Sequence, residues 1–260
     1  VGLVDGPVAK ELPHLNGANI VAAPGFSMAE CNPKSAAWQH GTFIASILSA
    51  HRSSPAPAIC PDCTLFVRPV FWDDQPTPRA TPEELAAAIM EGVGSGVRVL
   101  NLSVALTGRS RDGGRQIHDA LDHAMQNGTI VVAAAGNQSR VGGSTITAHP
   151  WVIPVVSYGF DGRPLDVSDL GASIGAGVGA PGEHVVGLAP DGSRLELSGT
   201  SVAAPFVSGA IALLWSQVPS ASAAEVRYAI TQQTRRRSIV PALLDAAMAH
   251  TRLQELSRRR

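Results

Sequence analysis

The sequence contains no apolar run that approaches the length of a membrane span, carries almost no net charge and has only three cysteines. A transmembrane helix needs about 20 consecutive apolar residues. A net charge of −1 gives no electrostatic reason to expect a nucleic-acid partner. We therefore predict a protein that neither spans a membrane nor binds nucleic acid.

The three cysteines are too few, and odd in number, for a disulfide framework. Cys60-Pro61-Asp62-Cys63 has the CxxC spacing of redox and zinc sites. A zinc site of this type normally needs a second pair of ligands, and only Cys31 and scattered histidines are available. A redox pair would stand at a helix start, whereas this pair precedes an expected strand at 64–70. A structural role, as a local disulfide or as buried thiols, is favoured, and metal or redox chemistry stays open.

Two short basic runs, 235–237 and 258–260, interrupt the balanced charge. A solvated helix face and a frayed tail are the favoured interpretations, ahead of a binding patch. No secretory signal is visible, and we expect a cytoplasmic protein. Because the sequence opens at Val1 directly into an apolar strand, a leader, pro-segment or preceding domain stays an open alternative.

Short continuous apolar runs alternate with helical patterns over most of the chain. Strands that are apolar without alternation are typical of a parallel sheet buried on both faces. The expected strands are 2–4, 19–22, 65–67, 97–100 and 129–133, and the expected helices are 41–50, 82–94, 115–127, 201–217, 222–232 and about 239–256. We predict a single α/β domain over 1–260, with a mostly parallel, doubly wound sheet and helices on both faces.

Local signals support parts of this assignment. Thr81 followed by Pro82 and two glutamates is a strong helix start, and Asn127-Gly128 is an equally good stop. Residues 139–198 are rich in glycine and proline, and we predict surface strands and loops there, including an extended run at 151–156.

Three segments carry candidate catalytic groups. Asp5 follows the first strand, at the sheet edge where ligands bind in open α/β sheets. His40 stands at the head of an apolar helix, with Gly41 beside it. Ser201 begins a long apolar helix, whose positive end favours the negative charge that develops during acyl transfer. Taken singly, each has a structural alternative: an aspartate that opens a turn, a histidine that caps a helix and a serine N-cap.

Together, and in the order Asp, His, Ser, these segments resemble the signatures of the subtilisin-like serine proteases. The most specific is the string from Ser198 to Gly209, which contains Gly-Thr-Ser-Val-Ala-Ala-Pro. The resemblance implies a subtilisin-like three-layer fold and a triad in which Ser201 is the nucleophile, His40 the general base and Asp5 the group that orients it. The chain departs from the family at Asp5-Gly6-Pro7, where Asp-Thr-Gly is usual.

Two further segments resemble functional strands of the same family. The run from Val132 to Asn137 implies that the Asn137 amide and the Ser201 backbone N–H form the oxyanion hole. The run from Asn101 to Ala105 implies a strand that pairs with the substrate backbone. The expected substrate-binding residues are Ser103, Val104, Ala105, Ala133, Ala134, Gly136 and Thr200. Phe71, Trp72, Asp73 and Asp74 are interpreted as a solvated turn, with recognition of a peptide side chain as the alternative.

A narrower resemblance is to the proteases of cyanobactin biosynthesis, which process ribosomally made precursor peptides. It rests on Asp5-Gly6-Pro7 and the strings at 15–19, 40–47 and 69–71. In that family the macrocyclising type carries a helical insertion between Asp and His, whereas the other type removes the leader. Only 34 residues (6–39) lie between Asp5 and His40, which favours the leader-cleaving, hydrolytic type.

Other functions stay open: a general protease, a transpeptidase or macrocyclase, and a noncatalytic peptide-binding scaffold. We expect a peptide or precursor peptide as the partner and no cofactor. Calcium loops are frequent in secreted relatives, but the stretch at 51–57 lacks the clustered carboxylate and amide oxygens that calcium prefers. We therefore predict no metal site, and in particular no tightly bound calcium at that place.

Overall fold

A computed structural model of the protein describes residues 1–258 apart from 16, 72–79, 105–110 and 233–237. The basic run at 235–237 and the last two residues of the tail lie outside this part. Seven strands form one parallel sheet in the order β2-β3-β1-β4-β5-β6-β7. Their bounds are β1 Gly2–Asp5, β2 Ile20–Ala22, β3 Leu65–Pro69, β4 Val99–Leu102, β5 Ile130–Ala134, β6 Ile153–Tyr158 and β7 Val178–Pro181. The predicted parallel sheet is confirmed.

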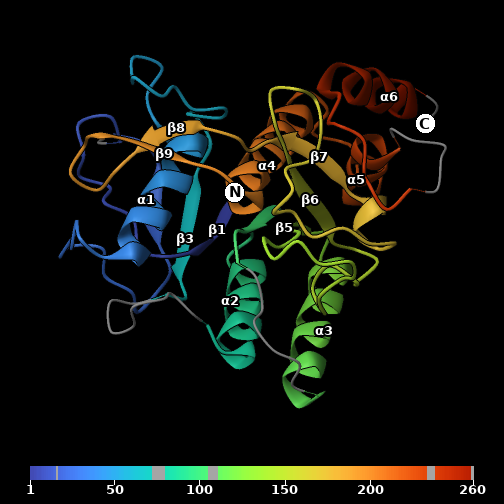
Figure 1. The fold of residues 1–260 in the computed structure, drawn as a ribbon, viewed down its shortest axis with the longest axis horizontal. Helices are drawn as coiled ribbons and strands as arrows, with labels where there is room; N and C mark the ends of the chain where they lie inside the picture. The colour runs from blue at the N-terminus through green and yellow to red at the C-terminus, as the bar shows by residue number, and fades with distance from the viewer. Residues whose placement is uncertain (16, 72–79, 105–110, 233–237, 259–260) are drawn as a thin grey trace.

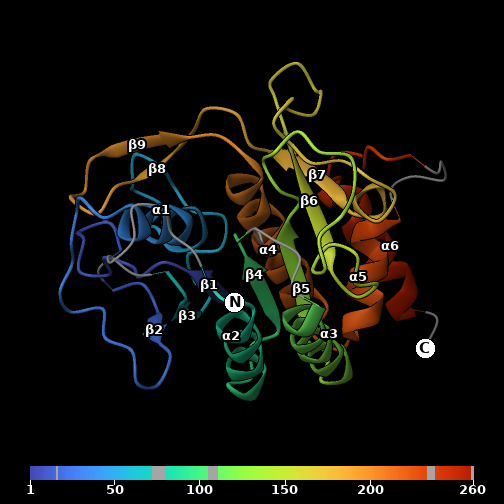
Figure 2. The same ribbon diagram turned by 60° about the horizontal axis from the view of Figure 1, so that its bottom comes forward.

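Helices cover both faces of this sheet, as predicted. On one face α2 (Pro82–Gly94) and α3 (Arg111–Gln126) pack side by side (Figure 2). On the other face lie α1 (Ala36–Ser49), α4 (Thr200–Gln217), α5 (Ala223–Thr231) and α6 (Ala246–Arg258). Successive strand residues point to opposite faces: in β1, Leu3 joins the core under α1 and Val4 the core under α2. The result is a three-layer α/β arrangement.

Short elements complete the fold. A 3₁₀ turn, η1 (Ile174–Ala176), leads into β7. An antiparallel hairpin, β8 (Val185–Leu188) and β9 (Arg194–Leu197), lies beside α1 (Figure 1). In the described part of the chain, no helix combines the length and the apolar character that crossing a membrane requires.

The predicted start of α2 is confirmed in detail. The Thr81 hydroxyl accepts from the Glu84 N–H, and the Glu84 carboxylate accepts from the Thr81 N–H. This reciprocal pair satisfies two backbone donors that a helix terminus would otherwise leave free.

Three expectations about elements are corrected. The first helix begins at Ala36 after the N-cap Ser35, so His40 lies inside it and not at its head. The extended run at 151–156 contributes to β6, which is buried in the sheet and not on the surface.

The last helix begins at Ala246 rather than near 239. The preceding segment pairs with β7: Gly179 N–H donates to the carbonyl of Ala242, and Leu244 N–H donates to the carbonyl of Gly179. Pro241 also lacks the N–H that a helix interior needs, and its carbonyl accepts from the Tyr158 hydroxyl at 2.5 Å. The helix α6 itself packs on the domain through buried Ala249 and Leu253.

Candidate active site

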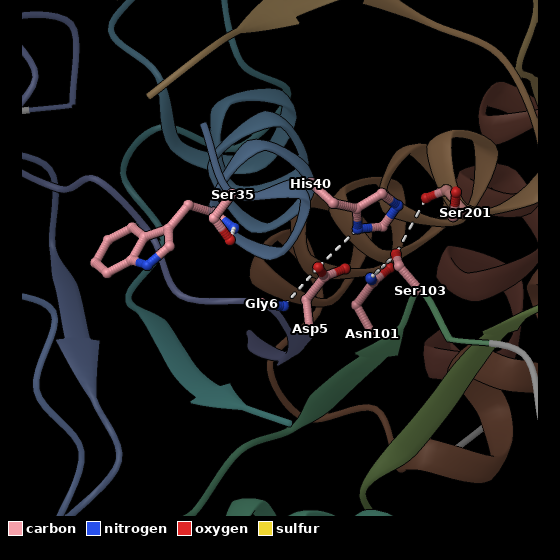
Figure 3. A network of polar contacts seen from close by, with 8 residues as sticks. Asp5, Gly6, Ser35, His40, Asn101, Ser103 and Ser201 are labelled. Carbon is pink, nitrogen blue, oxygen red and sulfur yellow. Dashed lines mark hydrogen bonds and ion pairs between the residues drawn. The ribbon is translucent and has the colours of Figure 1, made fainter. Parts of the chain in front are cut away.

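Asp5 and His40 form a hydrogen-bonded pair at the carboxyl end of β1, in which Asp5 is buried and His40 is partly exposed. Asp5 has no exposed side-chain surface, and its Oδ1 lies 2.7 Å from His40 Nδ1 (Figure 3). The same oxygen accepts from the Gly6 N–H at 2.6 Å. Because a carboxylate can only accept, Nδ1 carries a proton and the other ring nitrogen of a neutral His40 is an acceptor.

Two glycines allow α1 to approach β1 closely enough for this pair. A Cβ on Gly6 would overlap the Ala37 carbonyl oxygen, and a Cβ on Gly41 would overlap the carbonyl oxygens of Gly6 and Pro7. The departure from the usual Asp-Thr-Gly therefore has a steric reason, because a threonine at position 6 has no room beside α1.

Asp5 changes the acidity of His40. Burial, the largest influence on the ring, lowers its pKa, but the charge of Asp5 and the hydrogen bond to it raise it. The pKa of His40 consequently lies above its ordinary value of 6.5. The ring is a quarter exposed, so it is reachable from solvent while its carboxylate partner is not.

Ser201 is the second residue of α4, and a chain of buried polar groups holds its backbone. The Ser103 hydroxyl donates to the Ser201 carbonyl at 3.0 Å and accepts from the Asn101 amide at 2.7 Å. Asn101 in turn accepts from the Ser208 hydroxyl at 2.8 Å. Ser103 and Asn101 come from β4 and the residues that follow it, so the chain ties α4 to the sheet (Figure 3).

His40 lies between Asp5 and Ser201 (Figure 3). Its Nδ1 is turned to Asp5, and its second ring nitrogen is on the side of Ser201. Among the described residues no hydrogen bond joins the Ser201 hydroxyl to His40. Catalytic hydrogen bonds are often long without substrate and tighten in the complex.

The side-chain amide of Asn137 is oriented by Thr200. Asn137 Oδ1 accepts from both the N–H and the hydroxyl of Thr200, at 2.9 Å each. The Thr200 hydroxyl also accepts from the Gly136 N–H at 3.2 Å. The Asn137 NH₂ group is therefore turned away from Thr200 and lies beside Gly199, where an added Cβ would be 3.0 Å from Nδ2. The Ser201 N–H belongs to the same first helical turn and precedes the first helical hydrogen bonds, which the Val202 and Ala203 N–H groups donate to the Gly199 carbonyl.

The remaining predicted substrate-binding residues come from the ends of β4 and β5 and the loop that follows β5, and Val104 and Ala133 among them are buried in the core under α2 and α3. Ala133 and Ala134 end β5 and are buried, Ser103 and Val104 follow β4, and Gly136 precedes the loop that carries Asn137. Ala105, Trp72, Asp73 and Asp74 lie outside the described residues. Phe71 is buried in the core under α2, so it is not part of a solvated turn.

Sequence reasoning missed several residues of this site. Asn101 carries a recognisable signal, because a polar residue inside the apolar strand β4 has to find partners when buried. Ser208 lies on the buried face of α4 and is its partner. Asp169 accepts hydrogen bonds from the loop that carries Asn137, although it lies in a distant segment of the chain. No pattern in the residues next to Asp169 indicates this contact.

The described residues bring three groups of metal-ligand type together at one place outside this site. His118, Asp122 and His149 have ligand atoms within 4.8 Å of one another. However, His149 Nδ1 accepts from the Trp151 N–H at 3.2 Å, so the ring proton lies on Nε2, which donates to Asp122 Oδ1 at 3.2 Å. This arrangement is that of a hydrogen-bonded clamp between α3 and the segment before β6.

Cys31, Cys60 and Cys63 form no disulfide in the described part of the chain, so the local disulfide is absent there. Cys60 is buried and Cys63 is half-buried. Their hydrogen bond lowers the pKa of Cys63 to about 7, and the same bond, together with burial, raises the pKa of Cys60. The interpretation of the pair as thiols packed in the fold agrees with this geometry.

Comparison with known proteins identifies the family. The profile of the Subtilase family matches residues 1–253. The chain belongs to the subtilase family. Subtilisin DY of Bacillus licheniformis is 29% identical over 235 residues, covering 87% of this chain and 80% of that protein. Subtilisin E of Bacillus subtilis (strain 168) is 26% identical over 232 residues, covering 87% of this chain and 58% of that protein. Subtilases are serine endopeptidases.

Solved structures of subtilases resemble the whole chain. A mutant of the protease domain of PatA is 31% identical, with a TM-score of 0.87, covering 98% of this chain and 94% of that one. The prenylagaramide maturation protease PagA is 28% identical, with a TM-score of 0.82, covering 97% and 92%. The subtilisin-like fold and the resemblance to cyanobactin maturation proteases are thereby confirmed.

Proposed function

We propose that this subtilase is an active serine endopeptidase in which Ser201 attacks the peptide carbonyl, His40 takes its proton and Asp5 orients His40. The observation that carries the proposal is the hydrogen bond between buried Asp5 and His40, with the second ring nitrogen turned to the side of Ser201. A serine hydroxyl becomes a useful nucleophile only when such a base accepts its proton. The active unit is a single peptidase domain over 1–260.

The proposed oxyanion hole consists of the Asn137 side-chain amide and the Ser201 backbone N–H. The two bonds that Thr200 makes to Asn137 Oδ1 support this role, because they leave the NH₂ group free to donate. Donors that are fixed in advance stabilise the tetrahedral oxygen at no cost in reorganisation during the reaction. Ser103, Val104, Ala133, Ala134 and Gly136 are proposed to line the adjoining substrate groove.

The proposed substrate is a ribosomally made precursor peptide, from which the enzyme removes a leader by hydrolysis. The likeness to PatA and to the maturation protease PagA supports this assignment. Between β1 and α1, the described residues (6–35 without 16) form β2 and turns and contain no helix. The enzyme is therefore proposed to release a cleaved product with water as the acceptor, and not a ring.

Products from a mixed peptide library test this function directly. The parent protein and the variant Ser201→Ala are incubated with the library, and the products are read by mass spectrometry. We expect cleavage by the parent alone, pairs of products whose summed mass exceeds that of the intact peptide by one water, and a narrow sequence motif around the cut. Broad cleavage would indicate a general protease, cyclic products a transpeptidase, and equal cleavage by both proteins would contradict the assignment of Ser201.

Replacing Asn137 with alanine is expected to lower kcat about 10²- to 10³-fold and to leave KM nearly unchanged, because one donor to the tetrahedral oxygen is lost. The measurement is steady-state kinetics on a cleaved peptide. Gln116→Ala, which removes an exposed amide from α3, serves as the control and is expected to behave like the parent. A rise in KM with unchanged kcat would show that Asn137 serves ground-state binding.

The acid limb of activity is expected to lie above pH 6.5. The general base must be neutral, so kcat/KM rises as the pH passes upward through the pKa of His40, which Asp5 raises. The profile of kcat/KM from about pH 5 to about pH 9 measures this midpoint. A midpoint at or below the ordinary histidine value would contradict the pairing of His40 with a charged Asp5.

A further inference from the structure

The loop that carries Asn137 is held by a carboxylate from a distant segment. Asp169 Oδ1 accepts from the Gln138 N–H at 3.0 Å and from the Arg140 N–H at 2.9 Å. The Asp169 N–H donates to the Gly136 carbonyl at 2.9 Å. These three bonds lie on both sides of Asn137 in the chain, and the Asp169 side chain is only 8% exposed.

The backbone of this loop needs such support. Ser139 has a φ of +54°, in the left-handed region that costs a residue with a side chain about 1 kcal/mol. Ser139 lies between Gln138 and Arg140, whose N–H groups donate to Asp169. Its own N–H donates to the Val167 carbonyl at 2.9 Å. Residues 137–140 are exposed, so little packing restrains them. Hydrogen bonds with 167–170 therefore restrain the loop, including one that the Leu170 N–H donates to the Arg140 carbonyl at 2.9 Å.

Gly136 fits against the same carboxylate. It has a φ of +117°, and a Cβ at this position would overlap Asp169 Oδ2. Asn137 is consequently fixed from two directions: Asp169 holds the flanking backbone, and Thr200 holds the side-chain oxygen.

We propose that Asp169 is a positioning residue for the oxyanion hole, which fixes the loop at 136–140 so that the Asn137 amide meets the tetrahedral oxygen. This inference rests on the proposed function of Asn137. An oxyanion donor acts only when it is held within a fraction of an ångström of the developing charge. Asp169 touches neither substrate nor reacting atoms, so its effect passes through Asn137.

Kinetics of Asp169→Ala and Asp169→Asn test the proposal. We expect Asp169→Ala to lower kcat about 10- to 100-fold with little change in KM, because the donor is displaced and not removed. Asp169→Asn keeps an acceptor oxygen for the two N–H groups and is expected to recover part of that loss. Asp166→Ala removes an exposed carboxylate three residues away and is expected to match the parent.

The double variant Asp169→Ala with Asn137→Ala distinguishes a loss of Asn137 positioning from a general destabilisation of the fold. If Asp169 acts through Asn137, Asp169→Ala costs less than about threefold in kcat once Asn137 is already alanine. The same loss in both backgrounds would overturn the proposal, and so would a kcat for Asp169→Ala equal to that of Asp166→Ala. Thermal unfolding of each variant verifies that the folded protein is being compared.

Hydrogen exchange gives a readout that needs no catalysis. In the Ser201→Ala background, Asp169→Ala is expected to speed amide exchange at Gln138 and Arg140 and to leave the amides of β5 unchanged. Unchanged exchange at these two amides would overturn the inference even if the parent enzyme is active. A parent that cleaves no peptide while Asp169→Ala speeds this exchange would instead contradict the proposed function.

Discussion

Replacing Asp5 with asparagine is expected to lower kcat about 10⁴-fold and to move the acid limb of activity to lower pH. Asparagine cannot stabilise the imidazolium that forms when His40 takes the serine proton. It also removes the carboxylate charge that raises the pKa of His40 and weakens the hydrogen bond to the ring, whereas the burial that lowers this pKa remains. Profiles of kcat/KM against pH for the parent and the variant measure both effects.

The matched control is Asp119→Asn, an exposed carboxylate on α3. It changes the net charge by the same amount and is expected to leave both kcat and the acid limb unchanged. If Asp5→Asn retained kcat within about tenfold of the parent, Asp5 would not be the group that orients His40. An acid limb that stayed in place in this variant would mean that the titrating group is not His40.

Replacing Gly41 with alanine is expected to cost about 3 kcal/mol of folding free energy and roughly 10 °C in Tm. The new Cβ would overlap the carbonyl oxygens of Gly6 and Pro7, which are backbone atoms with little freedom to move. The helix α1 must then move away from β1 and carry His40 with it. Since displacement of a catalytic group by about 1 Å can cost 10²-fold, we expect a similar loss of kcat in the molecules that still fold.

Gly94→Ala is the control for this substitution. Gly94 is also helical, at the end of α2, but its added Cβ would meet no atom within 4 Å. Alanine there is expected to be neutral or slightly stabilising, because glycine is the poorer helix former. The measurements are the Tm and the kcat of both variants and of the parent. Equal stability of Gly41→Ala and the parent would contradict the close contact between α1 and β1.

Features fixed by neighbouring residues could be predicted from the sequence. The capping pair of Thr81 and Glu84 depends on residues three apart, and the apolar strands show a buried parallel sheet without knowledge of their partners. Asp5, His40 and Ser201 can be identified from the sequence because a carboxylate, an imidazole and a hydroxyl suit nucleophilic catalysis. They also follow the chain order of the subtilisin-like proteases. The sheet then brings the ends of β1 and β4 together at one edge.

Features fixed by distant residues could not be predicted in this way. The start of α6 depends on the pairing of 242–244 with Gly179, more than 60 residues earlier in the chain. Asp169 is 31 residues from Gln138, and nothing next to it in the sequence indicates a partner. The shared reason is that buried backbone groups find acceptors wherever the tertiary fold supplies them, and this overrides local preference.

Labelling with a fluorophosphonate tests most directly whether Ser201 is an activated nucleophile. The label is mapped by mass spectrometry of a digest, and its rate is compared among the parent, Ser201→Ala and His40→Ala. We expect one adduct per chain, on Ser201, which is absent in Ser201→Ala and forms at least about 10³-fold more slowly in His40→Ala. An unlabelled Ser201 in the parent, or labelling that is equally fast without His40, would contradict this expectation.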